Sequence, residues 1–157
     1  MAALRRNVAV LLLACWWGGF TFYALAVVPT GHAVLRSKVR QGFITEQVTT
    51  KLNWLGVAAL AVAATELAVR RGERRWFRLA VASWLAGALT LGGLFLLHHV
   101  LSGQLDFANR TVTDEEHFYG WHRAYLSIAT VQWFAGLGLL LALVSDRGEP
   151  FRSQTPP

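Results

Sequence analysis

The chain has little of what a soluble enzyme needs. Charged residues make up only 15% of its 157 residues, well below the roughly 25% of an ordinary soluble domain. Its single cysteine, Cys15, allows no internal disulfide. The sequence also has no phosphate-binding loop, no nucleophile elbow and no Cys-x-x-Cys pair. The best-known catalytic motifs therefore give no indication of a function.

What the chain has instead is long apolar runs. Hydrophobic residues make up 54% of the sequence, and four runs are free or nearly free of charge. Each run has about 18–22 residues, the length that an α-helix needs to cross roughly 30 Å of hydrocarbon. The runs are too long for strands and show no alternation of apolar and polar residues. They are Val8–Val28, Leu52–Val69, Leu79–Val100 and Ala124–Val144.

These runs predict an all-α fold, an integral membrane four-helix bundle that forms a single domain over residues 1–157. The helices are expected at about 8–28, 52–70, 76–101 and 114–144. Pro29 and Gly31 are expected to end the first helix, and residues 29–51 to form a loop. Thr113 and Glu116 have the spacing of a capping box, with Thr113 as the N-cap of the last helix. Pairs of small residues four apart, such as Ala59 and Ala63, favour close helix packing.

Basic residues predict the orientation in the membrane. Nine of the 15 lysines and arginines flank the side that holds both termini and the short 70–78 loop. The positive-inside rule therefore predicts that both termini are cytoplasmic, in a multi-pass protein of the bacterial inner membrane. Because the net charge of +6 follows this pattern, we expect no nucleic-acid partner. The expected partners are the lipid bilayer and other membrane subunits or further copies of the chain.

All five histidines fall on the predicted outer side, which indicates a site there. Imidazole suits copper, iron and zinc ions, and paired histidines suit haem. Haem b would take one of His98 and His99, which end the third helix, together with His122 on the fourth. Glu115, seven residues before His122, lies on the same helix face. The candidate metal ligands are His32, His98, His99, His117, His122 and Glu115.

A polar stripe on the fourth helix leads inward from these histidines. His122, Tyr125, Ala129, Gln132 and Gly136 recur at helical spacing. Polar groups in a membrane turn toward the interior of a bundle. The candidate cofactor-binding residues are therefore His98, His99, His122, Tyr125 and Gln132. In the second helix, Glu66 is expected to pair with Arg70, four residues on.

The residues leave several functions open. The leading hypothesis is a protein that binds haem or a transition metal for electron transfer or metal handling. The histidines could equally serve structural packing, pH sensing or proton carriage. The chain could also be a non-catalytic accessory subunit of a larger membrane complex, or a small transporter that uses Tyr125 and Gln132. Nothing in the sequence decides whether it is an enzyme.

Two segments carry a family resemblance. Trp16-Trp17-Gly18-Gly19-Phe20, with Val27-Val28-Pro29, resembles the first helix of a domain-of-unknown-function family of small four-helix membrane proteins. Phe118–Tyr125 resembles the histidine-bearing start of their last helix. That family is similar in outline to copper-resistance D-type and HemJ-type membrane domains. The resemblance implies the four-helix fold and the handling of metal or haem, but no particular reaction.

Overall fold

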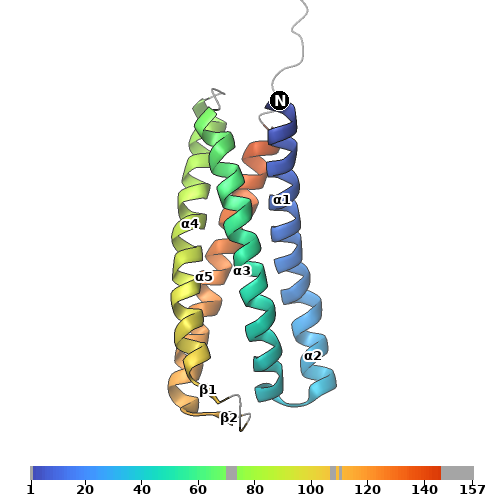
Figure 1. Cartoon of the computed structure of the whole chain (residues 1–157), viewed down its shortest axis with the longest axis vertical. Helices are drawn as coiled ribbons and strands as arrows, with labels where there is room; N and C mark the ends of the chain where they lie inside the picture. Colours follow the sequence, from blue (N-terminus) through green and yellow to red (C-terminus); the bar gives the residue numbers. More distant parts are fainter. Residues whose placement is uncertain (1, 70–73, 107–108, 110, 146–157) are drawn as a thin grey trace, which may run out of the picture.

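The protein is a bundle of long antiparallel helices (Figure 1). A computed structural model describes residues 2–69, 74–106, 109 and 111–145. Within these ranges, four helical segments are long and apolar enough to cross a membrane. They are Ala3–Leu35, Val39–Val69, Arg75–Gly103 and His117–Ser145. The all-α architecture predicted from the apolar runs is therefore confirmed.

We had expected the first helical segment to end at Pro29, but it continues past this residue. It runs through α1 (Ala2–Phe22), the π-helix η1 (Tyr23–Val27) and α2 (Val28–Leu35). The backbone N–H of Val28 bonds to the carbonyl of Tyr23, five residues back. Pro29 thus falls in the first turn of α2, where its missing N–H costs little. The helix finally ends at Arg36, which is left-handed with φ 48° and donates its N–H to the His32 carbonyl.

The long loop expected at residues 29–51 is also wrong. Helix α3 spans Lys38–Val69, so that only Arg36 and Ser37 separate it from α2. Ser37 caps the new helix, since its hydroxyl accepts a hydrogen bond from the backbone N–H of Arg40 at 3.3 Å. This stretch is helical because its polar residues recur every four positions and turn inward: Gln41 and Thr49 are buried.

The other half of the bundle is a helical hairpin with a pair of short antiparallel strands at its tip. Helix α4 (Arg74–Gly103) is followed by β1 (Leu105–Asp106), β2 (Thr111–Val112) and α5 (Glu115–Ser145). The N-cap of α5 is Asp114 and not Thr113. The Asp114 carboxylate accepts the backbone N–H of His117 at 3.1 Å, while the N–H of Thr113 bonds to the Gln104 carbonyl. Thr113 is thus used by the turn, and the cap moves on by one residue.

Small residues set how closely the helices approach. Ala59, Ala63 and Ala142 are fully buried, as their small-residue spacing predicts. At Gly56 on α3, a Cβ atom would lie 2.8 Å from the Trp16 indole of α1. The glycine therefore leaves the space in which this indole packs.

A buried ion pair joins α1 to α3 near the other end of the bundle. The Arg5 guanidinium lies 2.6 Å from the Glu66 carboxylate, whose side chain is only 7% exposed. The sequence had suggested Arg70 as the partner of Glu66. Arg70 lies outside the described residues, and the contact to Arg5 joins two helices rather than two turns of one.

Candidate functional site

The five histidines lie in segments at the end of the bundle that carries α2 and the strands β1 and β2 (Figure 1). Their side chains do not converge. His32, His99 and His117 are exposed, and only His98 and His122 are partly buried. In the described part of the chain, no three His, Cys, Asp or Glu side chains are grouped so that they could hold a metal ion. The side chain of Glu115, the acidic member of the expected ligand set, lies outside the described residues.

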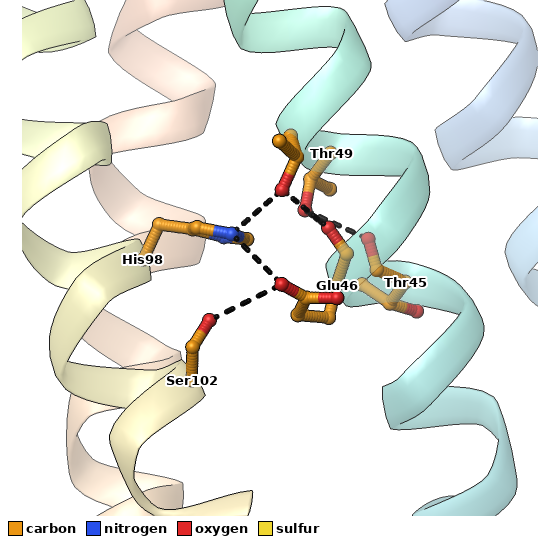
Figure 2. A network of polar contacts seen from close by, with 6 residues as sticks. Thr45, Glu46, Thr49, His98 and Ser102 are labelled. Atoms are coloured by element: carbon orange, nitrogen blue, oxygen red, sulfur yellow. Dashed lines mark hydrogen bonds and ion pairs between the residues drawn. The ribbon is translucent and has the colours of Figure 1, made fainter. Parts of the chain in front are cut away.

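His98 is the histidine that turns into the bundle. Figure 2 shows its ring reaching from α4 toward α3. Its Nε2 lies 2.8 Å from the Thr50 hydroxyl and 3.4 Å from Oε1 of Glu46. The Ser102 hydroxyl donates to the same carboxylate oxygen at 3.4 Å. Both charged partners are shielded, with His98 16% and Glu46 22% exposed. We call Glu46, Thr50, His98 and Ser102 the His98 site.

The hydrogen bonds at the His98 site indicate where the imidazole proton lies. The Thr50 hydroxyl donates its one hydrogen to the Glu46 backbone carbonyl at 2.9 Å. Its short contact with His98 then requires the hydrogen of Nε2. A proton on Nε2 also faces the Glu46 carboxylate, which can accept it. The site is therefore an imidazole beside a carboxylate, toward the histidine-bearing end of the bundle.

His122 lies apart from this arrangement. Its ring stacks on Phe118 with centroids 6.0 Å apart, and Phe118 packs on an apolar cluster between α4 and α5. That cluster consists of Leu94, Leu101, Tyr125 and Ala129. Apolar side chains thus fill the space between the two helices, and the rings of His98 and His122 each have partners of their own. The structure does not present them as a facing pair of haem ligands.

His117, another of the candidate metal ligands, forms an exposed surface pair with Asp114. Asp114 Oδ2 lies 2.8 Å from Nδ1 of His117, with the two side chains 50% and 73% exposed. This contact is part of the capping of α5, and exposed pairs of this kind contribute little to stability. It supplies no wall around a ligand.

A second polar group lies in the interior between η1, α3 and α5. It consists of Tyr23, Asn53 and Tyr125, which are 7%, 3% and 6% exposed. Thr49 and Asn53 are polar neighbours of the Tyr125 phenol. Thr45 is a polar neighbour of the Tyr23 phenol. Even so, Tyr23 Oη, Tyr125 Oη and Asn53 Nδ2 have no hydrogen-bond partner among the described residues. We call these three side chains the inner polar group.

Gln132 marks the deepest polar point on α5. It is 2% exposed, and its side-chain oxygen contacts the Thr90 hydroxyl on α4. It also lines a small hollow together with Trp16, Trp17, Phe20 and Trp133. Two indoles hold α1 against α5 there, because Trp133 Nε1 donates to the Thr21 hydroxyl at 2.8 Å and Trp17 Nε1 to the Trp133 carbonyl at 3.2 Å.

Below Gln132 the interior becomes largely apolar, although Ser83 on α4 is buried there. A core that includes Leu13, Ala59, Leu60, Leu139 and Leu143 separates Gln132 from the Arg5–Glu66 pair. Along α3, Asn53 and Glu66 are 13 residues apart, or about 20 Å at 1.5 Å per residue. Apart from Ser83 and Glu66, the buried polar side chains of the described residues thus lie between the histidine-bearing end and about the middle of the bundle.

Three residues of the His98 site, Glu46, Thr50 and Ser102, escaped the sequence analysis. Glu46 and Thr50 lie in the stretch we had expected to be a loop. Their spacing of four, with Asn53 three further on, is the signal of a helix with one polar face. Tyr23 was not among the candidate site residues. The π-helix that places it cannot be read from apolar periodicity.

Comparisons with known proteins add no identification. No protein-family model, no curated protein and no solved structure matches the chain.

Proposed function

We propose that the protein is an integral membrane protein that takes up and releases protons at the His98 site. The observation that carries the proposal is the contact of Nε2 of His98 with Thr50 at 2.8 Å and with the Glu46 carboxylate at 3.4 Å. An imidazole and a carboxylate at this distance can exchange one proton, and histidine titrates near neutral pH. Ionisable groups within membrane-spanning helices commonly mark proton paths.

The polar interior supports this role. It leads from the His98 site past the inner polar group to Gln132 and ends at the apolar core. A proton that enters from the histidine-bearing end therefore has polar surroundings for about half the bundle. Carriage across the whole membrane requires the apolar core to admit water or to shift. We place the histidine-bearing end outside and both termini in the cytoplasm of a bacterial cell, as the distribution of basic residues predicts.

Proton flux in reconstituted vesicles tests this function. The protein is placed in liposomes with a pH-sensitive dye inside, and a potassium gradient with valinomycin imposes the driving potential. We expect an internal pH change several-fold faster than in protein-free liposomes, falling to background in Glu46→Gln and His98→Gln. The matched control is His99→Gln, since His99 is the exposed neighbour of His98 on the same helix. Wild-type flux equal to that of protein-free liposomes contradicts the proposal.

A second candidate, binding of a transition metal ion, is favoured by one specific observation. The Glu46 Oε1 atom lies 3.4 Å from both His98 Nε2 and the Ser102 hydroxyl. Metal–ligand distances near 2.1 Å place two ligands of a tetrahedral ion about 3.4 Å apart. The site would then supply one nitrogen, one carboxylate oxygen and a hydroxyl, with His98 Nε2 deprotonated. This set replaces the one expected from sequence, in which Glu115 was the acidic ligand.

Elemental analysis of the same preparations decides between the two candidates. Near-stoichiometric copper, iron or zinc in the wild type, lost in Glu46→Gln and His98→Gln but kept in His99→Gln, would assign a metal site. A visible spectrum would show whether iron is present as haem. Metal at background together with His98-dependent flux supports proton handling. The accessory-subunit hypothesis predicts neither result and a co-purifying partner instead.

A further inference from the structure

The inner polar group poses a problem that the described protein atoms do not solve. Tyr23 comes from the π-helix η1, Asn53 from α3 and Tyr125 from α5. All three are more than nine-tenths buried, and each has a polar atom without a partner in the described part of the chain. These groups would need hydrogen bonds in any medium, and lipid or apolar side chains cannot supply them.

The positions of the three side chains indicate that these unpartnered polar atoms are a specific feature of the fold. Thr49, Asn53 and Tyr23 are neighbours of the Tyr125 phenol. Thr49 cannot serve as a donor to the phenol, because its hydroxyl hydrogen bonds to the Thr45 carbonyl at 2.7 Å. A π-helical turn is rare and is frequently found at functional sites. Here it directs Tyr23 into the same interior region.

We propose that Tyr23, Asn53 and Tyr125 enclose an internal water site in the outer half of the bundle. Water is the ligand that fits, because it both donates and accepts and one molecule can satisfy two to four buried polar groups. The surroundings are uncharged: two phenols, an amide and the hydroxyls of Thr45 and Thr49. An anion or a cation would find no counter-charge among the three side chains. The site extends the polar interior from the His98 site toward Gln132.

Hydroxyl-radical footprinting by X-ray radiolysis tests the water site in the wild-type protein. Radicals form from water wherever it lies, so that a buried side chain beside internal water is oxidised. The chain has three tyrosines, and Tyr119 is 44% exposed. In nanodiscs, we expect Tyr23 and Tyr125 to be oxidised at rates of the same order as Tyr119. Trp16 is equally oxidisable and 4% exposed in the apolar core, so it should be oxidised several-fold more slowly.

The comparison with Trp16 also controls for opening of the bundle, since Trp16 and Tyr23 lie on the same continuous helix. Oxidation of Tyr23 and Tyr125 as slow as that of Trp16 overturns the water site. Asn53→Leu removes the amide with little change in volume and should slow the oxidation of Tyr125 while leaving Tyr119 unchanged. If this variant fails to fold, the wild-type comparison still decides the question.

The water site deepens the proposed proton function but can be judged apart from it. Footprinting reports water beside tyrosines and does not depend on Glu46 or His98. Slow tyrosine oxidation with His98-dependent flux would remove the water site and leave the function. Rapid tyrosine oxidation without any flux would leave a hydrated interior and remove the function.

Discussion

At the scale of single residues, burial decides which polar side chains matter. The sequence predicts five histidines on one side, yet among the described residues only His98 meets a carboxylate inside the bundle. His117 also has an acidic partner, but both side chains are exposed. In water such a pair is weak, whereas shielding from solvent strengthens the interaction at His98. The difference follows from where the helices place the two side chains and not from residue type.

The Arg5–Glu66 pair yields a prediction at this scale. Arg5 is 33% exposed and can turn to water, whereas the Glu66 side chain is 7% exposed and cannot. Arg5→Met therefore leaves a buried carboxylate unpaired and should destabilise the protein by about 3 kcal/mol. Glu66→Gln should cost less, about 1–2 kcal/mol. Equilibrium unfolding in mixed micelles measures both, with Arg6→Met as the control. Equal losses for the two variants would contradict this account of the pair.

At the scale of elements, the bundle is organised by helix ends and close contacts. The π-helix η1 lets the first helical segment continue past Pro29. The tight turn at Arg36 and Ser37 then connects α2 to α3, which begins at Lys38. These two features add several turns of helix above the predicted spans. The added turns carry Gln41, Thr45 and Glu46, so the His98 site depends on them.

Gly56 provides the prediction at this scale. A Cβ there would lie 2.8 Å from the Trp16 indole, which is large, buried and held between α1 and α3. Gly56→Ala should therefore push the helices apart and cost about 1–3 kcal/mol.

Gly92→Ala is the matched control for this change, since a Cβ at Gly92 meets nothing within 4 Å. It should raise the unfolding free energy by about 0.5–1 kcal/mol, because alanine has the higher helix propensity. Both variants can be followed by unfolding in mixed micelles. A neutral Gly56→Ala would show that Trp16 has room to move.

At the scale of the whole molecule, the four apolar helical segments place the start of α1 and the end of α5 at the same end of the bundle (Figure 1). The histidine-bearing segments and the strands β1 and β2 lie at the opposite end. Our proposed function requires that the latter end face outward. The excess of arginines near the termini supports this orientation.

Cysteine labelling in intact cells tests the orientation. In a Cys15→Ala background, Thr111→Cys places a thiol in β2, and Arg75→Cys places one at the start of α4. Both positions are exposed. A membrane-impermeant maleimide should label Thr111→Cys in intact cells and Arg75→Cys only after permeabilisation. The reverse pattern would place both termini outside and turn the His98 site toward the cytoplasm.

The sequence by itself determined the architecture of four long apolar helical segments. Apolar runs of about 20 residues have few folded alternatives to spanning helices, because lipid leaves no other way to satisfy the backbone. The inward face of α5 also followed from spacing: Tyr125, Ala129 and Gln132 are buried as the polar stripe predicts. These features are local, and helical periodicity reports them directly.

Only the tertiary structure decided which polar side chains meet. His98 pairs with Glu46, 52 positions earlier, rather than with His122, and Glu66 pairs with Arg5, 61 positions earlier. Such contacts depend on the rotation and height of one helix against another, and these in turn depend on Gly56, the π-helix η1 and the turn at Arg36. A single helix carries no information about the face of its neighbour, and the chemistry of the site lies in that relation.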